Sequence, residues 1–167
     1  EWPWGLMEFI RLAKIKNLPL VCTLQNSYSL INRIVELGMT EIFFREKLSF
    51  FSYSPLGFGH LSGKYLKDPK AAGRVNLFPG YAQRYNKSGV EKAIEKYDAL
   101  AAKRNMSLTD LALSFVYSQW FVTSTVIGAT NMNQLKQNIA AYGLDIVDEE
   151  LIQEIDAIHL DVMNPAP

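Results

Sequence analysis

The sequence predicts an α/β fold built around three parallel strands. Three short segments have the apolar, β-branched or aromatic character of strands, namely residues 18–25, 48–53 and 123–127. Between and after them, apolar residues recur at helical spacing. Strands that alternate with helices form βα units, and βα units assemble into a parallel sheet.

The composition is that of an ordinary globular protein. Of the 167 residues, 49% are hydrophobic and 20% are charged, which is enough apolar material for a core. Seventeen basic and seventeen acidic residues leave no single-sign field, so nucleic acid is not expected as a partner. The apolar runs are far shorter than the roughly 20 residues of a membrane span, so no membrane association is expected.

Cys22 is the single cysteine of the chain, and it lies in the apolar run 20–24. We therefore expect a buried free thiol. Because it has no partner for an internal disulfide, it favours a reducing, cytoplasmic setting.

The first part of the chain predicts a helix, a strand and a second helix. Apolar residues over 7–13 mark the first helix, which Lys16 and Asn17 end before the strand 18–25. The second helix is expected over 30–37, with Gly38 as its C-cap.

Residues 49–65 predict a buried strand that leads into a ligand-binding loop. Pro55 ends the hydrogen-bond ladder, three glycines let the backbone approach a ligand, and Lys64 is placed to meet an anion. The same residues also fit a strand, a turn and a solvated lysine. Residues 66–87 show little periodicity and predict a long irregular loop, a candidate lid over the ligand.

Two further helices are expected before the third strand. Ser88 with Glu91 forms a capping box, and Ser107 with Asp110 forms another. Each box is followed by apolar residues at helical spacing, so each predicts the start of an amphipathic helix.

The third strand, 123–127, leads directly to a helix. Asn131 and Gln134 resemble a capping box at its start, and a helix N-terminus that follows a strand is suited to phosphate. A final capped helix is expected over 148–159.

Two motifs carry a resemblance to a known family. Tyr-Ser-Pro-Leu-Gly-x-Gly-x-Leu-Ser-Gly-Lys-Tyr over 53–65 resembles the loop after the seventh barrel strand of aldo-keto reductases, which are NADPH-dependent carbonyl reductases. Gly-Ala-Thr-Asn-x-x-Gln-Leu-x-x-Asn over 128–138 resembles their adenosine-phosphate motif after the last strand. The resemblance runs over essentially the whole chain and is strongest to the Tas-like reductases and the potassium-channel β subunits.

This resemblance implies a fold larger than the chain. A (β/α)8 TIM barrel needs eight strands and about 250 residues, and residues 1–167 match strands six to eight with their helices. The family's catalytic aspartate, tyrosine, lysine and histidine belong to the earlier strands, and none can be assigned here. Tyr28 and Tyr53 are the candidate acids by residue type, but Tyr28 has no matching motif. We therefore expect a truncated fragment that is inactive alone, and we assign no catalytic residue.

The resemblance implies an NADP(H) site. Gln25 would bind the nicotinamide carboxamide, and Tyr53 would stack on the nicotinamide ring, although a strand aromatic can equally be plain core. The remaining implied contacts fall into two groups. The pyrophosphate would lie against Ser54, Pro55, Leu56, Gly57 and Gly59.

The 2′-phosphate and adenosine contacts come from two further segments. Lys64 and Arg74 would pair with the 2′-phosphate, where the forked donors of arginine are suited to phosphate; alone, Arg74 also fits a solvated loop charge. Thr130, Gln134 and Asn138 would contact the 2′-phosphate, the ribose and the adenine. Gln137 stands where the family commonly has glutamate, which puts its adenine contact in doubt.

Other functions are open at this point. A non-catalytic NADP-binding or regulatory module, and an inactive fragment that self-associates through exposed barrel edges, are the alternatives to part of a reductase that takes a small carbonyl substrate. His60 reads as a loop residue and His159 as a helix-end residue, and neither has metal-ligand spacing to Cys22. We expect no metal.

Overall fold

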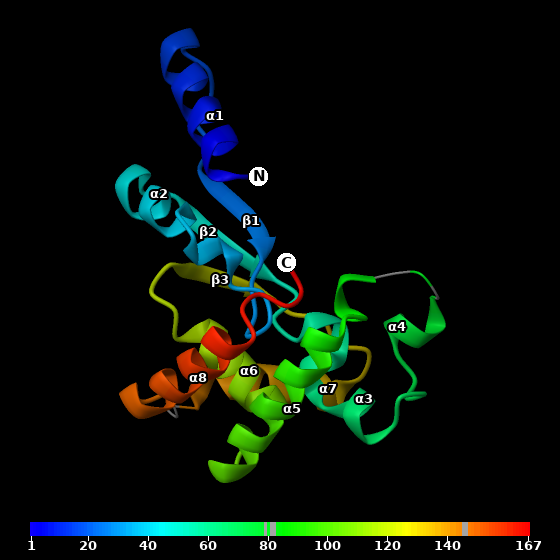
Figure 1. Cartoon of the computed structure of the whole chain (residues 1–167). Helices are drawn as coiled ribbons and strands as arrows, with labels where there is room; N and C mark the ends of the chain where they lie inside the picture. The colour runs from blue at the N-terminus through cyan, green and yellow to red at the C-terminus, as the bar shows by residue number, and fades with distance from the viewer. Residues whose placement is uncertain (79, 81–82, 145–146) are drawn as a thin grey trace.

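The computed structural model describes residues 1–78, 80, 83–144 and 147–167. Its sheet consists of β1 (Thr23–Ser27), β2 (Ser49–Tyr53) and β3 (Val122–Val126), in the order β1-β2-β3. Both strand pairs are parallel (Figure 1). The prediction of a parallel sheet of three strands is confirmed.

The first strand lies later in the chain than predicted. β1 begins at Thr23, and the apolar residues before it form an exposed connection in which Leu18 and Leu20 are more than half exposed. The prediction of a buried Cys22 is wrong, because this thiol lies in the same exposed connection. The apolar character of Leu18, Leu20 and Cys22 did not predict their exposure, because no element of the described chain covers them.

The predicted helix over 30–37 is also wrong. After α1 (Pro3–Lys16) and β1, the chain makes a tight turn and only a short 3-10 helix, η1 (Ile34–Glu36), before α2 (Met39–Glu46). Gly38 precedes α2 with φ of 100° and is not a C-cap. The apolar residues of 28–32 are buried by packing against other elements. Their apolar pattern resembles that of a helix, although this backbone is not helical.

The segment after β2 contains short helical turns in place of a featureless loop. They are η2 (Gly57–Ser62), α3 (Lys64–Lys67), α4 (Arg74–Leu77) and η3 (Gln83–Tyr85). Positions 79, 81 and 82 of the predicted loop lie outside the described residues.

Three of the four predicted helix caps form in the second half of the chain. Ser107, Asn131 and Asp148 accept hydrogen bonds from the third residue after each of them, at the starts of α6 (Leu108–Tyr117), α7 (Met132–Ala140) and α8 (Glu149–Asp161). Ser88 is not a cap: α5 (Ser88–Lys103) starts from Lys87, whose carbonyl accepts from the Val90 amide. The short η4 (Ala141–Gly143) follows α7.

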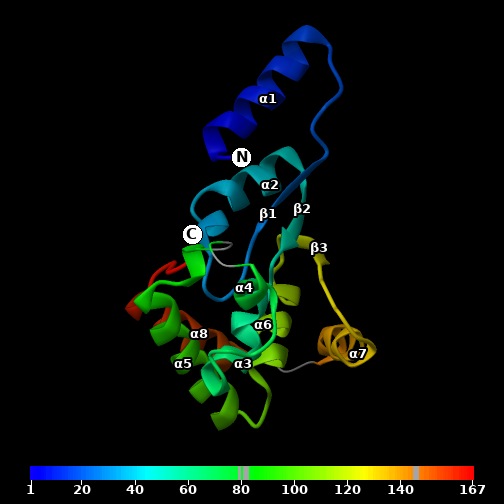
Figure 2. The same cartoon turned by 90° about the vertical axis from the view of Figure 1, so that its right-hand side faces the viewer.

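One face of the sheet is covered and the other is open. Leu24, Phe50 and Ser52 are buried, and Phe50 stacks on Phe43 with 5.0 Å between ring centroids. On the other face Gln25, Phe51 and Tyr53 are more accessible, as the period of two along a strand requires, although Ser27 at the end of β1 is buried. In both views α1 lies at the end of the molecule remote from α5 and α8 (Figures 1 and 2). The side chains of Gln25, Phe51 and Tyr53 therefore remain at least partly accessible on the open face.

Candidate functional site

Gln25 and Tyr53 project from the open face of the sheet. Gln25 pairs in register with Phe51, and Tyr53 lies two residues further along β2, so all three side chains lie on one face. Gln25 is exposed and Tyr53 is partly exposed. The structure thus places both predicted nicotinamide contacts on the same accessible surface, near the carboxyl ends of β1 and β2.

The loop that follows Tyr53 is a series of tight turns. The amide of Gly57 donates to the Ser54 carbonyl and that of Gly59 to the Leu56 carbonyl, both at 2.9 Å. Ser54 has φ of 55°, a left-handed conformation that is uncommon outside glycine. Gly57 has φ of 52°, and a Cβ there would lie 2.9 Å from Ile31 Cδ1, so a larger residue would be strained and would require the Ile31 side chain to shift. The five residues predicted to contact the pyrophosphate, Ser54, Pro55, Leu56, Gly57 and Gly59, form this one compact loop.

Lys64 and Arg74 each lie against a residue of this loop. Lys64 Nζ donates to the Ala72 carbonyl at 3.0 Å, which ties it to the segment that carries Arg74. The Arg74 guanidinium lies 5.3 Å from the centroid of the Phe58 ring, inside η2. Both cations therefore border the glycine-rich loop, as the 2′-phosphate hypothesis requires.

The start of α7 gathers most of the predicted adenosine contacts. Gln134 Oε1 accepts from the amide and the hydroxyl of Thr130, at 2.8 and 3.0 Å. Asn138 is buried and donates to the Gly128 carbonyl at 3.2 Å. Gln137 points elsewhere: its amide nitrogen donates to Ser107 Oγ at 3.2 Å.

A cavity of about 330 Å³ lies between β3 and the helical elements α6, α7 and η4. Thr123, Thr125, Tyr117 and Tyr142 line it together with Asn138. The cavity borders the outer edge of β3, which is the edge that does not pair with β2.

An aromatic group beside Lys64 was not anticipated from the sequence. The His60 ring stacks on Tyr85 at 5.3 Å and lies 4.9 Å from the Tyr65 ring, measured between centroids. Burial lowers the pKa of His60, and the charge of Lys64 lowers it further. A second cavity, of about 360 Å³, is lined by these three rings and the start of α5. The aromatic residues near Lys64 in the sequence were the signal that could have predicted this group.

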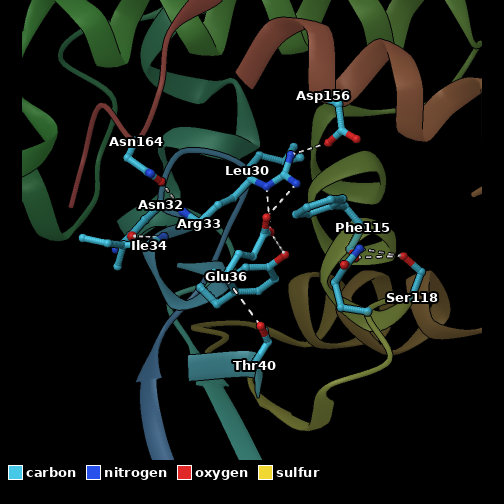
Figure 3. Close-up of polar contacts among 12 residues, drawn as sticks. Leu30, Asn32, Arg33, Ile34, Glu36, Thr40, Phe115, Ser118, Asp156 and Asn164 are labelled. Carbon is cyan, nitrogen blue, oxygen red and sulfur yellow. Dashed lines mark hydrogen bonds and ion pairs between the residues drawn. The ribbon is translucent and has the colours of Figure 1, made fainter. Parts of the chain in front are cut away.

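The turn after β1 is held rigidly by a charged network, shown in Figure 3. The Arg33 guanidinium donates to Glu36 at 2.7 and 2.9 Å and to Asp156 of α8 at 2.7 Å. The backbone amide of Arg33 donates to Asn164 Oδ1 at 2.6 Å. These contacts fix the turn that carries Ile31, which packs under Gly57.

The same network decides against Tyr28 as a proton donor on the open face. Tyr28 is fully buried, and its hydroxyl donates to Glu36 Oε1 at 2.6 Å. Burial raises its pKa far above the usual range, and the Glu36 carboxylate adds to the effect. A hydroxyl so held cannot reach a substrate.

The described residues contain neither a metal-ligand group nor a membrane-spanning helix. Nowhere in 1–78, 80, 83–144 and 147–167 do three or more His, Cys, Asp or Glu side chains gather as a metal-ligand group. Within those ranges no helix has the length and apolar character to cross a membrane.

Comparison with known proteins places these features in a family. The model of the aldo/keto reductase family matches residues 1–159. Protein tas of Escherichia coli (strain K12) is 40% identical over 167 residues, which are 100% of this chain and 48% of that protein. An aldo-keto reductase of Babesia bovis is 36% identical over 173 residues, covering 99% of this chain and 60% of its own length.

More distant similarity extends to a differently named protein. A probable voltage-gated potassium channel subunit beta of Oryza sativa subsp. japonica is 27% identical over 172 residues, covering 93% of this chain and 51% of its own length. The chain thus spans about half the length of the curated relatives it matches. On the family match and these identities, the chain belongs to the aldo/keto reductase family.

Proposed function

We propose that this chain is the C-terminal, NADP(H)-binding part of an aldo-keto reductase, an oxidoreductase that reduces aldehydes and ketones. The observation that carries the proposal is that Lys64 and Arg74 both border one glycine-rich loop, which follows the parallel strand β2. Ligands of parallel α/β sheets bind at the carboxyl ends of the strands. Two cations at that position suit a phosphate-bearing dinucleotide.

The donor set fits the rest of such a dinucleotide. Gln25 offers an amide to the nicotinamide carboxamide, and Tyr53 offers a ring face beside it. The loop 54–59 brings backbone close to a ligand without intervening side chains at Gly57 and Gly59. Thr130 and Gln134 offer polar groups to the adenosine half. Asn138 and Gln137 contribute less, because Asn138 is buried and donates to the Gly128 carbonyl and Gln137 donates to Ser107.

The residues of this chain would bind and orient, and the cofactor would supply the chemistry. When bound, a reduced nicotinamide provides the hydride that converts a carbonyl to an alcohol. Tyr53 and Gln25 would fix which ring face is presented to the substrate. We assign no proton donor in this chain, and we infer that the chain alone does not turn over.

We infer that β1, β2 and β3 are the sixth, seventh and eighth strands of a (β/α)8 barrel, so that residues 1–167 form part of one domain. Their sequential order, their parallel direction and the open sheet face support this assignment. The coverage of about half of each relative supports it as well.

A second candidate function is a non-catalytic NADP(H)-binding or regulatory module. The similarity to a protein named as a potassium channel subunit supports this second candidate. Carbonyl reduction by a longer protein that contains this chain would decide for the reductase. Cofactor binding without turnover in that longer protein would decide for the module.

Replacing both Lys64 and Arg74 by alanine tests the cofactor site. We expect NADP⁺ affinity to fall by a few kcal/mol, because two charge-assisted contacts are lost, while NAD⁺ affinity changes little. Calorimetric titration of both dinucleotides measures this. Arg45→Ala removes an exposed arginine paired with Glu41 and serves as the matched control. Equal losses for NADP⁺ and NAD⁺ would contradict the assignment.

A further inference from the structure

The hydroxyl of Tyr65 is buried and makes no hydrogen bond to any described residue. Most buried polar groups in folded proteins have a partner, so an orphaned hydroxyl requires an explanation. Nε2 of the neighbouring His60 is in the same condition. Among the described residues, two of the three buried polar atoms without a partner therefore lie beside Lys64.

Gly73 shows what surrounds this hydroxyl. A Cβ built on Gly73 would overlap both Tyr65 Oη and Lys64 Nζ, so the hydroxyl and the ammonium lie against the same point of the backbone. On another side, a Cβ on Gly59 would lie 3.1 Å from Lys64 Cε and 3.8 Å from Tyr65 Cε2. Glycine backbone thus borders the Lys64–Tyr65 pair at two places, and the Lys64 and Tyr65 side chains occupy the space that a Cβ of either glycine would need.

The surroundings of Tyr65 carry positive charge. Lys64 Nζ lies 4.8 Å from the centroid of the Tyr65 ring, and it donates a hydrogen bond to a neutral acceptor, the Ala72 carbonyl. Arg74 follows Gly73 directly and starts α4. The hydroxyl and the ammonium therefore meet at one short piece of glycine-containing backbone, and Arg74, which carries the guanidinium, is the next residue in the chain.

We propose that the Tyr65 hydroxyl is a third donor to the phosphate that Lys64 and Arg74 hold, and that it makes the chain more selective for NADP(H) over NAD(H). This inference rests on the proposed function. A phosphate is a stronger acceptor than a peptide carbonyl and takes the Lys64 ammonium from Ala72. The backbone of 72–73 then moves away from the Tyr65 hydroxyl, which donates to a phosphate oxygen.

The substitution Tyr65→Phe removes this donor and nothing else. A hydrogen bond to a charged acceptor is among the stronger ones, so NADP⁺ should bind about tenfold more weakly or worse. NAD⁺ lacks the 2′-phosphate, and its dissociation constant should stay within about twofold. Titration of both dinucleotides into the chain, and into the longer gene product where one exists, gives the two constants.

Thermal unfolding without ligand separates this role from a structural one. Removing an unpartnered buried hydroxyl should leave the melting temperature of the unliganded protein unchanged or raise it. Tyr97→Phe is the matched control, because that buried hydroxyl donates to the Leu30 carbonyl at 3.1 Å. It should lower the melting temperature and leave the ratio of the two dissociation constants unchanged.

The outcomes distinguish the two levels of the proposal. If the unsubstituted protein prefers NADP⁺ and Tyr65→Phe retains the full preference, the role of Tyr65 is wrong and the cofactor site stands. If the unsubstituted protein shows no preference for NADP⁺, the proposed function and the role of Tyr65 both fall.

Discussion

The surroundings of His60 in the fold differ from those that its place in the sequence predicts. From the sequence it is a loop histidine, but its ring is enclosed by Tyr65 and Tyr85 beside the Lys64 ammonium. Both the enclosure and the ammonium disfavour its charged form. The proposed phosphate site therefore keeps a neutral imidazole among its cations at neutral pH.

The depressed pKa of His60 predicts a pH dependence of stability. As the pH falls below about 6.5, the unfolded chain binds a proton that the folded chain resists, so the free energy of unfolding decreases. Above that pH the contribution is fully present. His60→Gln should flatten the loss of stability between about pH 7 and pH 5, as measured by denaturant unfolding.

His159 complicates this test in a known direction. Burial lowers its pKa as well, and Arg33 lowers it further, so it contributes a slope of the same sign. Substituting both histidines should flatten the profile more than either change alone. A His60→Gln profile identical to that of the unsubstituted chain would contradict the buried, neutral imidazole.

At the scale of elements, three of the four N-cap residues predicted from the sequence form caps, and the fourth, Ser88, does not. Asp148 accepts from the Leu151 amide at 2.7 Å and starts α8, whereas Ser88 lies inside the first turn of α5 and caps nothing. The two residues therefore form a matched pair for a stability test.

Asp148→Ala should cost about 1 kcal/mol of unfolding free energy, because an N-cap acceptor is lost. Asp148→Asn should recover most of that loss, since asparagine is also a good N-cap. Ser88→Ala should change stability by less than about 0.5 kcal/mol. Urea unfolding of the three variants measures these differences, and an equal loss for Ser88→Ala and Asp148→Ala would show that capping is not the cause.

At the scale of the whole molecule, the sheet leaves two open edges. Among the described residues, β1 and β3 each pair with β2 alone, and Val126, Ile139 and Tyr142 are exposed around the outer edge of β3. Unpaired strand edges beside apolar surface favour pairing with another chain.

We expect the isolated chain to associate with itself as its concentration rises. Val126→Lys places a charge on the β3 edge and should shift the association to higher concentration. Leu160→Lys changes an equally apolar, exposed residue on α8 and should not. Sedimentation velocity over a concentration series compares them. A monomer at every concentration would remove this expectation.

The isolated chain should also fail to reduce carbonyls. A missing general acid costs about 10² to 10⁴ in rate even where the rest of a site is intact. The one buried tyrosine at the end of β1, Tyr28, is committed to Glu36. Oxidation of NADPH with a panel of aldehydes and ketones, using mass-verified protein, measures this. Turnover near typical enzyme values would reveal a proton donor that the present assignment lacks.

The sequence by itself determined the local features of this protein. Its two motifs predicted the family, and the strand 49–53, the parallel sheet and the caps at Ser107, Asn131 and Asp148 were predicted correctly. These features depend on nearby residues: β-branched and aromatic runs favour strands, and a cap needs only a side chain close to the helix start.

Tertiary structure alone decided the features that depend on distant residues. Residues 30–37 were predicted to be helical because burial by other elements produced their apolar pattern, and Cys22 was predicted to be buried although no described element covers it. The approach of Lys64 to the segment of Arg74, and the enclosure of His60 and Tyr65, come from the folding of one loop over another. A local pattern records which side chains are apolar or charged, but the chain path decides which of them meet.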